Sequence, residues 1–561
     1  MKKKLLTIFA LFSALAMIAG FSACADETVK KPQSGEEEQG EPSGGEKPGE
    51  EEPGGQEKEP QDISDSLVFT KNAERTAYAV ADLSDMQTEG YVVIPESYEG
   101  LPVTEIGEAA FGDCRYLTGV TLPETVTKIG NDAFYNCESL EALAFPKGLQ
   151  QVGEYLVKGC VSLSSITVEE GCEAYFAEGN CLVESETKTL VAGCAASEIP
   201  PLKVQTVAEG AFADQRGLEK IYFPAGVSKI GRYAFLGCSG LKEIQFAGDM
   251  REIGDGAFSD CRSLTKFSLP YKVDQLGNGV LAGCDALAQI LVSSNNTRFL
   301  SEGNCIIERA SGILKAGCPT SVIPSDGKVT SVGYFAFGNC RGLKELTLPA
   351  SVTQIDGFAF QGCVDLERVV LPQNLDKIGD GAFNQCSSLT GIVIPANVLE
   401  IGIRVFNGCP LTSIQVEEGN AVYHSAGNCL IRTQERVLVE GCSQSVIPSD
   451  GSVTIIGPYA FSECDGLKHI DIPSPVKSVG LSAFSLCRNL VSVTLPESLE
   501  LITYTAFGHC DSLSQVTFAQ TEGWVCAPWN GGESTAVDVS DPAKNASLLS
   551  DELKDRNWSR A

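Results

Sequence analysis

The sequence predicts a solenoid of stacked coils that is mostly β structure. A block of the form Ala-Phe-x-x-Cys-x-x-Leu, followed by an apolar strand, recurs every 23 residues between Cys114 and Cys510. A fixed period of this length is typical of repeats in which each unit buries its apolar face against its neighbours. Within the block, Val120 and Leu122 flank Thr121, and this alternation has the period of a β-strand.

One complete coil runs from Leu117 to Glu138, and its strand ends at Pro123. Apolar residues such as Ile129 and Phe134 then return every three to four residues, which favours a short helical or 3₁₀ turn. We place these turns on the convex side of a right-handed coil. Counting one strand per coil predicts a parallel β-ladder of about 18 rungs. At about 4.8 Å per rung the ladder is about 85 Å long, which predicts a rod or a shallow arc.

The motif Ile-Gly-x-x-Ala-Phe-x-x-Cys recurs in register at 129–137, 253–261 and 378–386. It resembles the repeat of the BspA-like class of bacterial leucine-rich-repeat proteins, and the resemblance extends from about Tyr91 to Phe518. The resemblance implies a leucine-rich-repeat solenoid (α/β, mostly β). Three positions depart from the motif, because Gln215 replaces the cysteine and Val157 and Leu281 replace the phenylalanine.

A longer repeat of 124 residues overlies the short one. In each of its three copies one coil is replaced by Gly-Asn-Cys followed by twelve residues and a second cysteine. Apolar residues on both sides of a polar centre are typical of a β-hairpin. We therefore predict three inserted β-hairpins, near residues 179–196, 303–320 and 427–444.

The amino terminus predicts export and anchoring. Three lysines precede an apolar run that suits a secretory signal over residues 1–23. The run ends in Gly-Phe-Ser-Ala-Cys24, which resembles a bacterial lipobox, although Phe21 differs from the usual leucine. The resemblance implies lipidation of Cys24 after cleavage, and two or more acyl chains would hold the protein on a membrane.

Residues 24–62 are predicted to be a disordered tether. From Ala25 to Asp62 the chain has 13 acidic and 4 basic residues and almost no large apolar side chain. Such a composition buries too little surface to fold. We therefore interpret this segment as a spacer between the lipid anchor and the repeats.

The remaining chain divides into three predicted parts. Residues 63–100 form an N-terminal cap, residues 101–519 the solenoid, and residues 520–561 a C-terminal cap. All three tryptophans of the chain lie in the last part, where they suit the closing of an open apolar end. An alternative is that these rings are exposed and contact a carbohydrate or a protein.

The chain has 22 cysteines, which in an exported protein often indicates disulfides. Here the cysteines recur at the same place on successive coils, so their side chains run parallel and favour a buried row of thiols. The hairpins differ, because their two equal arms can place two cysteines opposite each other. The sequence leaves open whether disulfides join three pairs: Cys181 with Cys194, Cys305 with Cys318, and Cys429 with Cys442.

Motifs for catalysis are absent from the sequence. The three histidines, His424, His469 and His509, do not lie near a nucleophile or at metal-ligand spacing. Nucleotide, zinc-protease and serine-hydrolase motifs do not occur. We expect no enzyme activity, no metal and no cofactor. The net charge of −31 also argues against nucleic acid as a partner, since that requires a basic surface.

The outward positions of the predicted strands are the candidate binding residues. They are mostly small and polar, and Tyr222 is the only aromatic among them. The candidates on this strand face are Tyr222, Gln245, Leu291, Val370, Val393, Gln415 and Asp471.

The resemblance implies a surface protein of bacteria that adheres to host or other cells. We expect a lipid-anchored, extracytoplasmic protein that binds a protein or polysaccharide through a multivalent array of repeats, without catalysis. It should contact the membrane through its anchor alone and be a monomer. The alternative is a glycan-binding or envelope-structural surface protein, and an enzyme is the third hypothesis.

Overall fold

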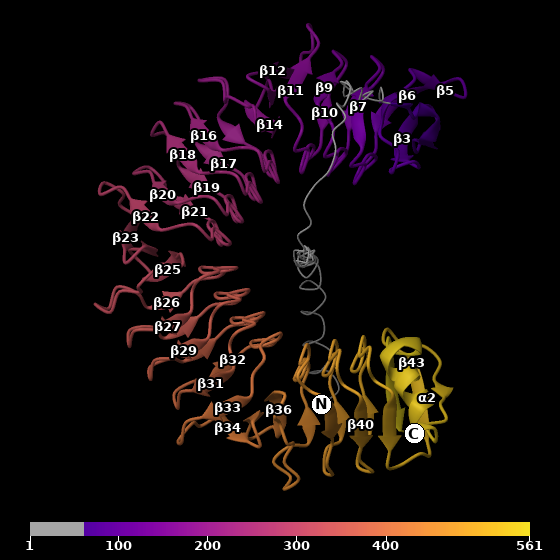
Figure 1. The fold of residues 1–561 in the computed structure, drawn as a ribbon, viewed down its shortest axis with the longest axis vertical. Coiled ribbons are helices and arrows are strands. Elements are labelled where there is room, and N and C mark those ends of the chain that lie inside the picture. The colour runs from indigo at the N-terminus through magenta and orange to yellow at the C-terminus, as the bar shows by residue number, and fades with distance from the viewer. Residues whose placement is uncertain (1–60, 561) are drawn as a thin grey trace, which may run out of the picture. The chain divides into compact units, whose positions relative to one another are not determined.

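The computed structural model describes residues 61–560. The predicted signal segment, Cys24 and nearly all of the predicted tether lie outside the described residues. Residues 61–560 form a β-solenoid of about 19 turns with almost no helix (Figure 1). The predicted mostly-β repeat solenoid with caps and inserted hairpins is therefore confirmed.

Each regular coil contributes one strand to a first ladder, which lies on the outer side of the curved solenoid (Figure 1). Its strands are β4 (Gly90–Val93), β7 (Leu117–Thr121), β9 (Ala142–Phe145), β11 (Ser165–Val168), β16 (Lys220–Phe223), β18 (Glu243–Phe246), β20 (Lys266–Leu269), β22 (Gln289–Val292), β27 (Glu345–Thr347), β29 (Arg368–Val370), β31 (Gly391–Ile394), β33 (Ser413–Val416), β38 (His469–Asp471), β40 (Ser492–Leu495) and β42 (Gln515–Phe518). Neighbouring strands are parallel, as in β16 and β18, but the ladder is divided into several short sheets.

Three of the predicted rungs, at Glu198, Val322 and Val446, are not strands. Each follows a hairpin, and its backbone N–H donates to a glycine carbonyl of that hairpin at 2.8 Å. The hairpin turn therefore occupies the place beside these rungs where a neighbouring strand would lie.

A second parallel ladder was not predicted. The Ile129 position, expected to lie in a helical turn, forms a two-residue strand that pairs with the next coil. The strands are β6 (Leu101–Ile106), β8 (Lys128–Ile129), β10 (Gln151–Val152), β15 (Thr206–Val207), β17 (Lys229–Ile230), β19 (Glu252–Ile253), β21 (Gln275–Leu276), β26 (Ser331–Val332), β28 (Gln354–Ile355), β30 (Lys377–Ile378), β32 (Glu400–Ile401), β37 (Ile455–Ile456), β39 (Ser478–Val479) and β41 (Leu501–Ile502).

The turns that contain Ala-Phe lie on the concave edge and not on the convex side, so that prediction was wrong (Figure 1). They are single i→i+3 turns, such as Tyr135 N–H to Asp132 O at 2.9 Å, and not helices. The hairpins explain the direction of curvature. At the turn edge the coils on either side of a hairpin touch directly, with Gly159 N–H donating to Ala213 O at 3.1 Å. The hairpins thus lengthen the ladder side alone, and the solenoid bends more than the predicted shallow arc.

The hairpins are three-stranded antiparallel inserts. Insert 1 has β12 (Tyr175–Glu178), β13 (Cys181–Glu184) and β14 (Thr189–Gly193); insert 2 has β23 (Phe299–Glu302), β24 (Cys305–Glu308) and β25 (Ile313–Ala316); insert 3 has β34 (Tyr423–Ala426), β35 (Cys429–Arg432) and β36 (Val437–Glu440). The first turn of insert 1 holds Gly179 and Asn180 at φ 58° and 56°, which suits a two-residue hairpin turn.

Both faces of each insert are buried. In β24, Ile306 packs into the core on the N-terminal side, whereas Ile307 packs into the core on the C-terminal side. Leu182 and Val183 of insert 1 divide in the same way. The inserts therefore separate the interior into four hydrophobic clusters in place of one continuous core.

Cysteine thiols bond successive coils together. The Cys137 Sγ–H donates to the carbonyl of Phe111 in the preceding coil at 3.1 Å. The same contact is made by Cys160, Cys238, Cys261, Cys284, Cys363, Cys386, Cys409, Cys487 and Cys510. Gln215 replaces one cysteine and donates across insert 1 to Val157 O at 2.9 Å. Burial raises the pKa of several of these thiols, well above the ordinary value for Cys137 and Cys261 and to about 12 for Cys510.

The hairpin cysteines are free thiols in the structure, namely Cys181, Cys194, Cys305, Cys318, Cys429 and Cys442. The strand register explains this, because Cys181 lies opposite Gly193 and Cys194 is one residue further along. Successive side chains of a strand point to opposite faces. Cys181 and Cys194 accordingly lie in different hydrophobic clusters.

Caps close both described ends. At the N-terminal end are β1 (Gln61–Asp62), η1 (Ser64–Ser66), β2 (Leu67–Lys71), β3 (Tyr78–Leu83) and β5 (Ser97–Tyr98). At the C-terminal end are β43 (Trp524–Pro528), β44 (Thr535–Ala536), α2 (Pro542–Ser547), η2 (Leu548–Glu552) and β45 (Arg556–Arg560). Trp524 and Trp558 are buried against the last coil, whereas Trp529 is 61% exposed and stacks on Tyr504. Within residues 61–560 there is no helix of the length and apolarity needed to span a membrane.

Candidate functional site

The seven strand-face candidates point outward from the first ladder, but the structure does not bring them together. Tyr222 pairs with Gln245 on β16 and β18, and Val393 pairs with Gln415 on β31 and β33. The remaining three, Leu291, Val370 and Asp471, lie on other sheets of the ladder. Tyr222 is 53% exposed. The strand face therefore offers isolated contacts and no shared hollow.

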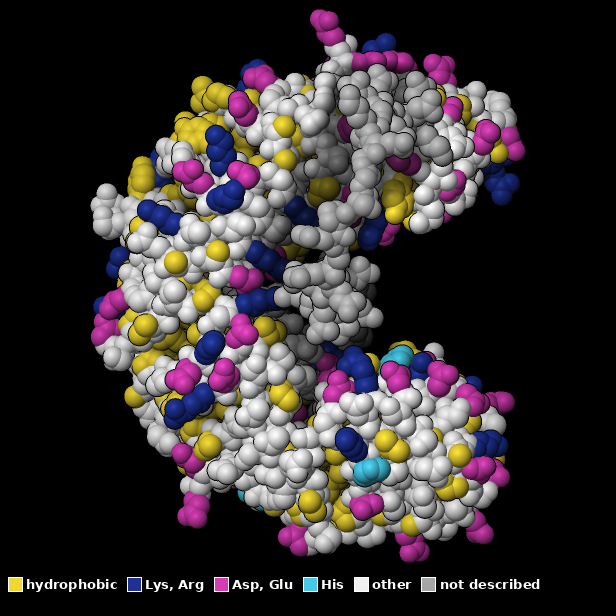
Figure 2. Space-filling model, viewed as in Figure 1, with side chains coloured by type: hydrophobic (Ala, Val, Ile, Leu, Met, Phe, Trp, Pro, Cys, Tyr) yellow, Lys and Arg dark blue, Asp and Glu magenta, His cyan; other side chains and the backbone are white. Residues whose placement is uncertain are grey.

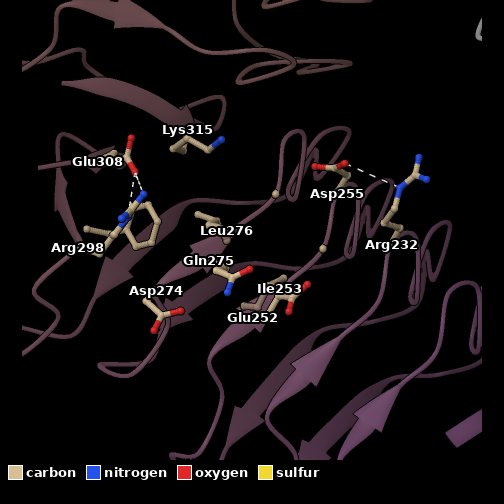
Figure 3. Close-up of a pocket in the computed structure, with 13 residues that line it drawn as sticks. Arg232, Glu252, Ile253, Asp255, Asp274, Gln275, Leu276, Arg298, Glu308 and Lys315 are labelled. Carbon is tan, nitrogen blue, oxygen red and sulfur yellow. Dashed lines mark hydrogen bonds and ion pairs between the residues drawn. The ribbon is translucent and has the colours of Figure 1, made fainter. Parts of the chain in front are cut away.

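A hollow among the described residues lies where insert 2 meets the second ladder. It has a volume of about 420 Å³ and continues into a second hollow of about 260 Å³ along β15 to β19. We call the two together the central groove. Figure 3 shows its walls, with Arg298, Glu308 and Lys315 on the insert and Arg232 and Asp255 on the coil turns opposite.

The groove carries charges of both signs. Arg298 Nε donates to a Glu308 oxygen at 3.0 Å, and Arg298 Nη2 lies 2.8 Å from the same oxygen in an ion pair. Glu308 also accepts from Ser311, and these contacts, the Ser311 bond first, lower the pKa of the Glu308 carboxyl. Across the groove the Arg232 Nε lies 3.8 Å from an Asp255 oxygen. The site can therefore bind a ligand that presents both donors and acceptors.

Lys315 is the partly buried cation of the groove. Its Nζ donates to Asn278 Oδ1 at 2.7 Å. Burial lowers the pKa of the Lys315 ammonium, because the charged form is removed from water. A contact with a neutral amide compensates this loss less than a carboxylate would.

The other inserts lack these cations. Insert 1 carries Ala174 and Val191 at the places of Arg298 and Lys315, and insert 3 carries Val422 and Val439. All four are partly buried against the neighbouring coils. The sequence analysis missed the groove because it searched for chemical motifs within single coils. Comparing the three inserts position by position would have found it.

Aromatic residues on the concave turn edge are a second feature that the sequence analysis missed. They occupy turn positions with positive φ, for example 55° at Tyr155 and 53° at Tyr233. The partly exposed members of this set are Tyr155, Tyr233, Phe335, Phe358 and Tyr459. Arg404 lies over the Tyr459 ring at 4.2 Å. Figure 2 shows basic side chains along the same inner edge in the middle of the solenoid.

Groups that could hold a metal ion are not found in residues 61–560. Among the histidines, His424 Nδ1 lies 2.8 Å from Thr433 Oγ1, and His469 Nδ1 lies 2.8 Å from Ser492 Oγ. Each of these two contacts a single hydroxyl, and the contact fixes the ring without building a reactive group.

The comparisons with known proteins agree with this architecture. A family model described as a BspA type leucine rich repeat region of six copies matches residues 94–186, 194–305, 316–426 and 439–522. A search of curated proteins gives no match.

Three solved structures are similar in fold. A leucine rich cell surface protein from Faecalibacterium prausnitzii is 20% identical, with 82% of this chain and 94% of that chain covered and a TM-score of 0.33. The pneumococcal vaccine antigen PcpA is 18% identical, with 80% and 95% covered and a TM-score of 0.39. A leucine-rich repeat protein from Bacteroides ovatus is 23% identical, with 80% and 92% covered and a TM-score of 0.30. Because the family model matches well over half of its residues, the chain belongs to the BspA-type leucine-rich-repeat family.

Proposed function

We propose that this chain is a lipid-anchored bacterial surface protein that binds a protein partner through its concave edge and central groove. The observation that carries the proposal is the groove itself. It is a hollow of about 420 Å³, and two of its cations, Arg298 and Lys315, stand on insert 2 at places where the other two inserts carry apolar residues. A structural repeat has no need of charges at one of three equivalent positions where apolar residues suffice.

The residue types along the concave edge support a protein partner. Tyrosine and arginine are enriched in protein interfaces, and they contribute most where their rings and guanidinium groups become buried. Two arginine–tyrosine pairs occur on this edge. Arg232 lies 5.4 Å from the Tyr233 ring, and Arg404 lies over the Tyr459 ring. Adhesion to host or other cells follows if such a partner lies on another surface.

The location is supported by the amino-terminal sequence and by the relatives. The apolar run before Cys24 suits export, and Cys24 suits lipidation, after which the acidic tether would separate the anchor from the repeats. One similar structure is described as a cell surface protein, and another as a vaccine antigen.

Glycan binding or an envelope-structural role is the second candidate. It is favoured by one observation, the exposed Trp529 ring stacked on Tyr504 at 5.7 Å. An exposed ring pair at the end of a solenoid is a surface on which a sugar can stack.

A binding array of matrix proteins, cell-surface proteins and polysaccharides tests the proposal, with the purified protein as probe. The expected result is saturable binding to a protein that survives Trp529→Ala and is lost when Arg232 and Arg298 are both changed to alanine. Binding to a polysaccharide alone, abolished by Trp529→Ala, would favour the second candidate and contradict the first. Deleting an insert is unsuitable, since both of its faces are buried.

A further inference from the structure

Lys315 is a partly buried cation without an ion pair among the described residues. Salt bridges within 4.0 Å occur at many lysines of the solenoid, yet the one polar contact of Lys315 is with Asn278. Glu308, Asp255 and Asp356 are the acidic groups that influence it from farther away. Since an ammonium has three donors, two of them remain available on the groove side.

Such an arrangement disfavours the empty groove electrostatically. A charge that is removed from water is stable where a partner of opposite charge compensates it. Arg298 shares this wall, and its side chain is 54% exposed although one edge is bonded to Glu308. Arg232 reaches in from the opposite wall with its nearest carboxylate oxygen 3.8 Å away. Three cations therefore have hydrogen-bond donors to spare around one hollow.

We propose that the central groove binds an acidic peptide segment, with one carboxylate side chain seated at Lys315 and with Arg298 and Arg232 on the walls to either side of this lysine (Figure 3). This inference rests on the proposed function, since it names the chemistry of the protein partner at the same site. Inserts 1 and 3 carry valine at the place of Lys315, so the site occurs once, where insert 2 meets the coils before it.

The lining of the groove favours a peptide over other anions. Glu252, Asp274 and Gln275 lie along its floor and can accept from the backbone N–H groups of an extended chain. Phe299 is the one aromatic residue in the larger hollow and is 2% exposed, so no ring face is available for a sugar. A phosphate with two charges would meet the carboxylates of Asp255 and Glu308, whereas a single carboxylate brings one charge for Lys315.

Fluorescent decapeptides that alternate alanine with glutamate, glutamine or lysine are the probes, and polygalacturonate is the carbohydrate carboxylate. The expected result is binding of the glutamate peptide alone. Lys315→Val should weaken it about 10- to 100-fold, as expected for loss of a charge-assisted hydrogen bond. Arg298→Ala should act in the same direction. Valine and alanine occupy these places in insert 1, so both variants should fold.

Val439→Lys is the matched control, because it places a lysine at the same position of insert 3 without the arginines. It should leave peptide affinity unchanged. Lys315→Met is the second variant, which keeps the length of the side chain and removes its charge. A second readout is acetylation of Lys315 followed by mass spectrometry, which the glutamate peptide should slow in the wild-type protein.

Equal affinity of wild type, Lys315→Val and Lys315→Met for the glutamate peptide would overturn the inference. So would preferential binding of polygalacturonate, of the glutamine peptide or of the lysine peptide. The two proposals fail separately. A protein found on the array that binds Lys315→Val as well as wild type leaves the proposed function intact and removes this inference. Binding of the glutamate peptide, with no protein bound on the array, would keep this inference and remove the proposed function.

Discussion

Insert 2 has the same strand arrangement as inserts 1 and 3, but it differs from them in its side chains. In all three inserts, the second strand begins with a cysteine directly after a Gly-Asn turn. This strand lies between two hydrophobic clusters. Only insert 2 replaces partly buried apolar residues with Arg298 and Lys315. The shared features build the scaffold, and the difference is the feature on which the proposed ligand site rests.

Insert 3 departs in another way. Glu440 stands where the other inserts have Ala192 and Ala316, and it is 6% exposed. Burial raises the pKa of the Glu440 carboxyl well above its ordinary value, with the Phe406 backbone N–H as a partner. This carboxyl points into the core and not into a hollow, so it affects stability and not recognition.

The largest expected effect tests whether the inserts are structural. Ile306→Ala and Ile307→Ala should each destabilise the protein by about 2–5 kcal/mol, because each leaves a cavity in a different buried cluster. Urea unfolding followed by circular dichroism measures the change. A surface hairpin would be sensitive at one of the two positions, so an unchanged midpoint for either variant contradicts burial of both faces.

Glu440 predicts a dependence of stability on pH. The folded state keeps the proton that the unfolded chain releases above the ordinary glutamate pKa, so the side chain costs stability as pH rises toward its folded pKa. Glu440→Ala should therefore gain about 1–3 kcal/mol near pH 8 and little near pH 4.

Glu440→Gln is the control for the charge, since it has the same shape and does not titrate. It should remove the pH dependence while keeping the packing. Parallel unfolding midpoints of wild type and Glu440→Gln across this pH range would show that folding does not raise the pKa of the Glu440 carboxyl.

Exchanging residues between inserts 2 and 3 should change stability by a smaller amount, and with opposite sign for the two exchanges. Val439→Lys should lose about 1–2 kcal/mol, because Ile403 stands where Asn278 accepts from Lys315, and the new ammonium gains no acceptor there. Lys315→Val should be neutral or slightly stabilising. Thermal unfolding of both variants measures the change in stability. An unchanged midpoint for Val439→Lys together with a lowered midpoint for Lys315→Val would contradict the view that Lys315 costs stability.

The smallest effect concerns ion pairs between coils. Lys477 Nζ lies 2.9 Å from a Glu500 oxygen, and both side chains are more than half exposed. Lys477→Ala should change stability by less than about 1 kcal/mol, since exposed pairs gain little in water. A larger loss in the unfolding midpoint, removed by high salt, would show that these pairs stabilise the solenoid more than exposed pairs usually do.

The repeat made the scaffold predictable, because the buried positions of Cys137 and Phe134 recur in successive coils with equivalent neighbours and few substitutions. The second ladder was missed because a two-residue strand at Lys128 and Ile129 is too short to show alternation. The direction of curvature depends on where the inserts lengthen the coils, which a single coil does not reveal.

The candidate site was not predictable from periodicity, since it consists of departures from the repeat. Arg298 and Lys315 have no motif around them, and Arg232 and Asp255 come from coils that precede the insert. The strand-face candidates were chosen for exposure, but exposure alone does not create a hollow. Lipidation of Cys24 stays a prediction.

The most direct measurement uses a chimera in which residues 298–317 are replaced by the sequence of residues 174–193. Insert 1 then stands in place of insert 2, with the same cores on both sides and without Arg298 and Lys315. Partner binding, measured by surface plasmon resonance with the protein identified on the array, should be lost while the thermal unfolding midpoint is retained. A folded chimera that binds as well as wild type would contradict the assignment of function to the central groove.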